Sequence, residues 1–189
     1  MSLKSISDKI ENKIEEKRNK AKSISIKEGM CNSFSEGCGI NYIIPYALAM
    51  NANNTQIGIL SSLPNLVGSL GEYFAIKEMW KYKRKHIVFS GVFVQAILWL
   101  FIIAIGTTYF VFRTNPNLSV TLLIMIYTLL IGFGMSVTPI WASWMKDLIL
   151  KKQGEYFGIR NKYVGAVTLT SLLFAGFILD YFKQTYIFL

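Results

Sequence analysis

Residues 54–72 have the sequence NTQIGILSSLPNLVGSLGE, and this stretch decides the fold class. Wound as a helix at about 100° per residue, it places its small and polar residues on one stripe. These residues are Gly58, Ser61, Ser62, Asn65, Gly68, Ser69 and Glu72. The rest of the surface is Ile, Leu, Val and Pro, the reverse of a soluble helix. An apolar outside with a small, polar inside is typical of a helix in lipid, and it predicts a membrane protein of several spans.

The composition of the 189-residue chain agrees with a membrane protein, since 52% of its residues are hydrophobic and 16% are charged. Most of the charge lies in residues 1–28 and in two short clusters, which leaves apolar runs of the roughly 20 residues that a bilayer span needs. The predicted spans are 29–50, 55–76, 87–109, 119–145 and 161–182. Residues 1–28 lack the apolar core of a signal peptide. They are predicted to form a cytoplasmic charged leader helix, either on the anionic membrane surface or solvated.

The basic residues alternate with the predicted crossings. Of the 20 Lys and Arg residues, 18 lie in residues 1–28, 77–86 and 146–162. The segments on the other side hold only Arg113 and Lys183. By the positive-inside rule, this predicts a multi-pass protein of the cell membrane with its N-terminus in the cytoplasm. The same topology accounts for the net charge of +9, so no nucleic-acid partner is expected.

Polar side chains recur at helical spacing in the predicted first span, on the arc formed by Asn32, Ser35, Glu36, Gly39, Tyr42 and Tyr46. Glu36 is the single acidic residue well inside this span. A carboxylate there costs roughly 2.5–3.5 kcal/mol on insertion scales, so it should face a partner or a water-filled cavity. Glu36 would then be a proton carrier, a cation ligand or a substrate contact. The structural alternative is an acid that reaches interfacial water or caps a neighbouring helix.

Other polar residues extend the set of candidates into the later spans. Asn65 would bind a substrate or another helix, and Glu72 would form a structural salt bridge with the nearby basic clusters. The predicted fourth span has small or polar residues on both faces and should be enclosed by neighbours, whereas the third should be peripheral. The candidate substrate or proton pathway comprises Glu36, Asn32, Tyr42, Asn65, Tyr127 and Trp141.

Residue patterns typical of enzymes are missing from the sequence. There is one histidine, His86, and the two cysteines, Cys31 and Cys38, are expected to pack on one helix. The sequence contains no G-x-S-x-G, P-loop or H-E-x-x-H motif. We therefore expect no catalytic residue, no cofactor and no metal site.

Four segments carry a family resemblance. They are PYALAMNANNTQIGILSSLPNLVGSL, the basic link KEMWKYKRKHIVFSG, PIWASWMKDLILKKQGEYFGIRNKYVGAV and AGFILDYF. Together they resemble the N-terminal half of a major facilitator superfamily (MFS) transporter over residues 29–182, most specifically at 139–165. The basic link lies where that family has its cytoplasmic gating loop. The resemblance assigns this role to Glu72, Glu78, Lys83, Arg84 and Lys85.

The chain departs from the family pattern at several places. The family's loop motif is reduced to Lys83, Arg84 and Lys85, without its aspartate and glycines. No arginine lies near Tyr127, where some members use one in proton coupling. These departures do not favour proton antiport, and they leave Glu36 as the candidate for a coupling proton.

The resemblance implies an all-α bundle with five spans of a six-helix domain, truncated before or within a sixth helix. It also implies secondary active transport of a small solute by alternating access, with the substrate between two helical bundles. A missing C-terminal half or a second copy would then complete the cavity. The alternative is a five-span membrane scaffold or partner subunit without transport, which dimerises through the small-residue stripes. A membrane enzyme acting on lipid is a third possibility.

Overall fold

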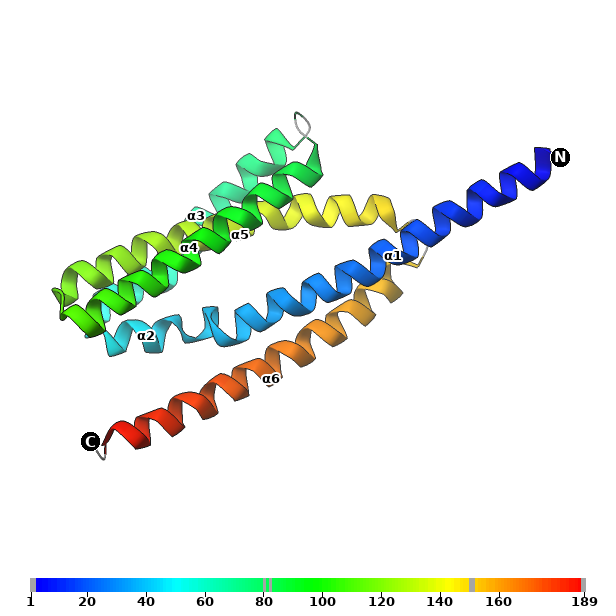
Figure 1. Ribbon diagram of the computed structural model, residues 1–189. Helices are drawn as coiled ribbons and strands as arrows, with labels where there is room; N and C mark the ends of the chain where they lie inside the picture. The colour runs from blue at the N-terminus through cyan, green and yellow to red at the C-terminus, as the bar shows by residue number, and fades with distance from the viewer. Residues whose placement is uncertain (1–2, 80, 82, 150–151, 188–189) are drawn as a thin grey trace. The chain divides into compact units, whose positions relative to one another are not determined.

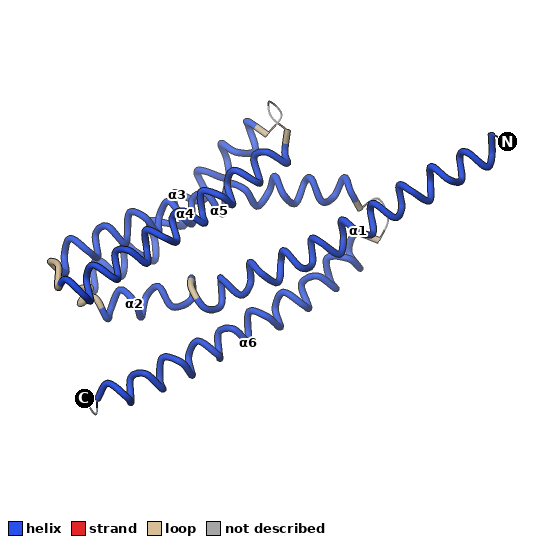
Figure 2. Tube along the Cα trace, viewed as in Figure 1, coloured by secondary structure: helices blue, strands red, loops and turns tan. Residues whose placement is uncertain are grey.

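The structure is a computed structural model that describes residues 3–79, 81, 83–149 and 152–187 of the chain (Figure 1). In this described part every regular element is a helix, and there is no strand (Figure 2). The elements are α1 (Leu3–Cys38), the 3₁₀ turn η1 (Ile40–Tyr42), α2 (Ile43–Ala49), α3 (Asn54–Glu78), α4 (Arg84–Phe112), α5 (Pro116–Leu148) and α6 (Gln153–Ile187). They form two compact units. Unit 1 comprises Met1–Tyr42 with Lys146–Leu189, and unit 2 comprises Ile43–Met145.

Among the described residues, three helical segments are long and apolar enough to cross a membrane. They are Arg84–Phe112, Pro116–Leu148 and Gln153–Phe182, and they contain three of the five predicted spans. α3 is not among them, because its serines, asparagines and glutamates lower the hydropathy of an otherwise apolar helix. The described part of the chain is therefore all-helical and holds three candidate membrane spans, and the first and second predicted spans stay predictions.

The predicted first span, residues 29–50, is not one continuous helix. α1 ends at Cys38, η1 follows, and α2 begins at Ile43. Pro45 favours a break here, since it lacks the N–H that a continuous helix would donate to the carbonyl of Asn41. The polar arc predicted to run to Tyr46 is therefore divided, and Tyr46 lies in unit 2.

Two predicted boundaries also fall inside helices. α1 continues through residue 28, so the leader and the start of the first predicted span form one helix. The cytoplasmic location of the leader stays a prediction. α6 extends to Ile187, so the apolar run that would begin a sixth helix belongs to α6 instead. No glycine or proline interrupts the chain between residues 177 and 187, which is why the helix does not end at Phe182.

Small residues bring α1 and α6 together in unit 1, where the two helices lie side by side (Figure 1). A buried row at four-residue spacing lies along α1: Ser25, Gly29, Ser33 and Gly37. A Cβ at Gly37 would meet Ser171 Oγ and would lie 2.8 Å from the Thr168 carbonyl oxygen. Only glycine allows this approach, which is the small-residue packing common between membrane helices.

In unit 2, α5 packs against both α3 and α4. Gly68 and Gly71 of α3 face Met135 and Ser136 of α5. On the α4 side, the Gln95 amide donates to the Leu130 carbonyl at 3.3 Å. The most apolar window of α5 is 39% buried, against 17% for that of α4. Within this unit α5 is therefore more buried than α4, in the direction that the sequence predicts, and the enclosure of the fourth span stays a prediction.

Local signals set the start of α3. The Asn53 side chain accepts a hydrogen bond from the Gln56 N–H at 2.8 Å. The Gln56 side chain accepts one from the Asn53 N–H at 3.0 Å. This reciprocal pair is a capping box, and it satisfies two backbone donors that the first helical turn would leave unpaired.

Candidate functional site

The polar stripe of α3 lies on the outside of unit 2. Ser61, Ser62, Asn65 and Ser69 are exposed, whereas Leu60, Pro64 and Gly68 are the buried residues of this helix. The prediction that the whole stripe is buried was therefore wrong, and only its member Gly68 is in the helix contact. Glu72, one turn beyond Gly68, is half-buried and has no ion pair with any residue that the structure describes.

Hydrogen bonds within the helix explain why these side chains can lie outside. Each serine hydroxyl donates to the carbonyl four residues earlier at 2.9 Å, and the Asn65 amide does the same to Ser61. A side chain satisfied in this way does not need a partner on another helix. The exposed set Ser61, Ser62, Asn65 and Ser69 is called the α3 polar stripe below.

A second exposed polar surface lies on α1 in unit 1. Asn32 and Glu36 are exposed, one residue before Ser33 and Gly37 of the buried row. Their side chains therefore lie off the face that packs on α6. The Glu36 backbone carbonyl accepts a hydrogen bond from the Asn41 amide at 3.1 Å, across the end of α1. Both candidate residues are available to water or to a ligand in this unit.

The remaining pathway candidates are less accessible. Tyr42 is half-buried, and its hydroxyl donates to the Leu172 carbonyl of α6 at 2.8 Å. Tyr127 is buried on α5, and Trp141 is half-buried on the same helix. The structure thus brings Asn32 and Glu36 together on α1 and Ser61 to Ser69 together on α3, each set within its own unit.

A local ion pair joins two residues of the predicted gating loop. The Lys81 ammonium lies 2.7 Å from the Glu78 carboxylate, three residues away, and both side chains are well exposed. Lys83 precedes α4 without capping it through its side chain, and Lys85 is exposed. Arg84 is half-buried in the first turn of α4. An exposed pair of this kind is worth at most about 1 kcal/mol, so the pair itself holds little in place.

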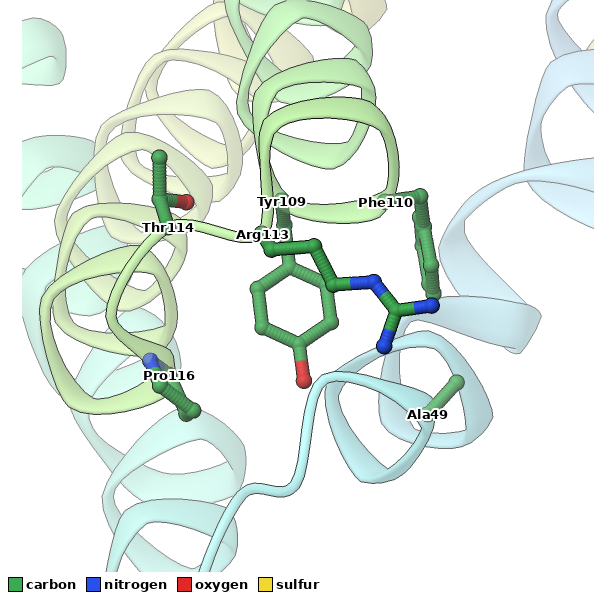
Figure 3. A pocket seen from close by; sticks show the side chains of 6 residues that line it. All are labelled: Ala49, Tyr109, Phe110, Arg113, Thr114 and Pro116. Carbon is green, nitrogen blue, oxygen red and sulfur yellow. The ribbon is translucent and has the colours of Figure 1, made fainter.

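A hollow that sequence reasoning missed lies at the other end of unit 2, where α2 and α4 end and α5 begins (Figure 3). Its volume is about 390 Å³. The residues that line it are Ala49, Tyr109, Phe110, Arg113, Thr114 and Pro116. The sequence signal for this feature was Arg113 itself, because it is the only charged residue between positions 87 and 145.

Two residues at this end of unit 2 are in the left-handed backbone region. Arg113 ends α4 with φ 52° and ψ 44°, and Asn51 has φ 61° in the link before α3. The Asn51 amide donates to the Tyr109 hydroxyl at 2.7 Å, which ties this link to α4. Asparagine tolerates this backbone conformation better than arginine does, so Arg113 is the more strained position.

No protein-family model, curated protein or solved structure matches the chain. Among the described residues, no group of three or more His, Cys, Asp or Glu side chains could hold a metal ion.

Proposed function

We propose that the chain forms the first helical bundle of a secondary transporter of the MFS type, which moves a small solute by alternating access. The α3 polar stripe is the observation that supports this proposal most directly. A membrane helix that turns serines and an asparagine away from its own unit presents a surface that suits a water-filled cavity or a further bundle better than lipid. A solute pathway between two bundles supplies such a cavity.

Asn32 and Glu36 support the same interpretation from unit 1. They form the corresponding exposed polar surface of α1, and Glu36 is the acid that a coupled proton or a cationic solute would use. The stripes contain Asn, Ser and one Glu, a set compatible with sugars, amines or drug-like cations. In this proposal the N-terminus and the 77–86 link are cytoplasmic, and the cell membrane is the location.

A non-transporting scaffold is the second candidate function, and exposed glycines favour it. A Cβ at Gly154, Gly158 or Gly165 of α6 would meet nothing within 4 Å. Gly154 and Gly158 form a G-x-x-x-G pair, a spacing that lets two helices approach closely. In this alternative, the small residues pair two copies of the chain, and no solute passes.

Uptake of radiolabelled sugars, amines and organic cations tests the transport proposal in cells that express the gene in its native genomic context. Asn65→Leu should lower uptake of the transported solute by about tenfold, because the solute loses a polar contact worth roughly 1.4 kcal/mol. The matched control is Leu66→Ala, one residue away and also exposed. Equal uptake by the Asn65→Leu variant and the wild type would remove the α3 polar stripe from the pathway.

Glu36 is tested separately in the same assay. If it carries a coupling proton, Glu36→Gln abolishes the pH dependence of uptake. If uptake and its pH dependence are both unchanged, Glu36 has no part in coupling. The Asn65 result would still stand in that case.

A further inference from the structure

Arg113 is an isolated positive charge at the end of unit 2 where the hollow lies. Residues 43–71 contain no charged side chain, and Arg113 is the only charge from 87 to 145. The acidic residues of unit 2 are Glu72 and Glu78. The nearer of these two to the start of α3 is Glu72, which lies 18 residues beyond it, roughly 27 Å along the helix. Within the described chain, the Arg113 guanidinium has neither an ion pair nor a hydrogen bond.

The side chains around the hollow offer hydrogen-bond donors. The Tyr109 hydroxyl accepts from Asn51, so its own proton is available for another acceptor. The Thr114 hydroxyl shares a 2.9 Å hydrogen bond with Ser119, in which either oxygen can be the donor. The guanidinium adds up to five N–H donors in a planar fork that matches the oxygens of a phosphate. No carboxylate lines the hollow, so its polar groups suit an oxyanion.

The hollow also borders an apolar surface. Phe110 lines the hollow, is 52% exposed and lies three residues before Arg113, at the end of a candidate membrane span. An arginine at such a boundary lies at the level of the lipid headgroups, with the aromatic rings facing the hydrocarbon. A free oxyanion would use only the donors, whereas a lipid would use both the donors and this apolar surface.

From these observations we propose that the hollow beside Arg113 binds the phosphate of a membrane phospholipid, whose acyl chains lie against Phe110. An arginine fork commonly holds phosphate oxygens by such charge-assisted hydrogen bonds. The site is separate from the α3 polar stripe and does not depend on transport.

The test is native mass spectrometry of the purified chain in neutral detergent, titrated with dioctanoyl phosphatidylglycerol. Two further probes separate the sources of the binding. Dioctanoylglycerol has the same chains without phosphate, and inorganic phosphate has the oxyanion without chains. The variants are Arg113→Gln and Arg113→Gly, with Lys162→Gln as a control that removes an exposed charge from unit 1.

We expect one phosphatidylglycerol to bind with an affinity about tenfold or more weaker in both Arg113 variants and unchanged in Lys162→Gln. Glycine accommodates the left-handed backbone that arginine adopts at position 113, so Arg113→Gly keeps the fold and isolates the loss of the guanidinium. Phosphatidylglycerol binding that is equally tight in the Arg113 variants overturns the proposal. The proposal is also overturned if dioctanoylglycerol, which lacks the phosphate, binds as tightly as the phospholipid. The proposal is also overturned if inorganic phosphate binds as tightly as phosphatidylglycerol and this binding depends on Arg113. That result would indicate a site for a free oxyanion.

Discussion

The Tyr42 hydroxyl donates a hydrogen bond to the Leu172 carbonyl at 2.8 Å, which joins η1 to α6 within unit 1. Gly176, one turn later in α6, leaves room for this contact, because a Cβ there would lie 2.9 Å from the Tyr42 hydroxyl. Cys38 makes a weaker contact of the same kind, from its sulfur to the Ser171 carbonyl at 3.4 Å. Tyr42 therefore fastens the end of the α1 segment to α6. It could bind a solute only by giving up this bond.

Removal of the Tyr42 hydroxyl should weaken unit 1. We expect Tyr42→Phe to lower the free energy of unfolding by about 1 kcal/mol, the usual net value of one hydrogen bond. SDS unfolding of the purified chain, followed by circular dichroism, measures this difference. Tyr163→Phe is the control, since Tyr163 lies on α6 with its side chain half exposed. Equal losses in the two variants would show that the Tyr42 bond contributes nothing specific.

The glycines of unit 1 should differ sharply in their tolerance of a methyl group. Gly37→Ala places its Cβ against Ser171 and the Thr168 backbone, so we expect a loss of about 1–3 kcal/mol from overpacking. Gly165→Ala has open space around it and should be neutral or stabilising by up to about 1 kcal/mol, because alanine favours the helix. Both values come from the same SDS titration. A harmless Gly37→Ala would contradict the close approach of α1 and α6.

The capping box should stabilise the start of α3. Asn53→Ala removes the side-chain acceptor for the Gln56 N–H, and we expect it to cost about 1 kcal/mol. Asn54→Ala, at the next position, provides the matched control because Asn54 is exposed and does not take part in the box. Hydrogen exchange of the Gln56 and Ile57 amides gives a local measure. If these amides exchange faster in both variants, the loss of stability does not come from the capping box.

The sequence predicted the candidate spans best where apolar runs are long and end at charged residues. The spans at 87–109, 119–145 and 161–182 lie within α4, α5 and α6 for this reason. The first predicted span stays a prediction, but its helix is divided, because hydropathy alone does not register the break between Cys38 and Ile43.

The candidate site was predicted less well, for two physical reasons. The α3 serines looked like contact residues, but hydroxyls that bond to their own helix can also lie outside, so polarity alone did not fix the direction of the stripe. The hollow at Arg113 depends on a left-handed residue at a helix end. No composition or periodicity rule places such a residue beside Tyr109.

The central claim is that the α3 polar stripe faces water in the membrane, as a solute pathway requires. Thiol labelling tests it most directly, after Cys31 and Cys38, the two native cysteines, are replaced by serine. Ser62→Cys, Asn65→Cys and Ser69→Cys probe the stripe. Leu66→Cys and Leu70→Cys probe exposed apolar positions of the same helix.

In membranes from cells that express the gene natively, a membrane-impermeant maleimide should label the three stripe cysteines much faster than the two leucine positions. Equally slow labelling at all five positions would place the stripe in lipid and contradict the claim. Disulfide-linked dimers at the stripe positions, with no labelling, would instead support the scaffold that pairs two copies.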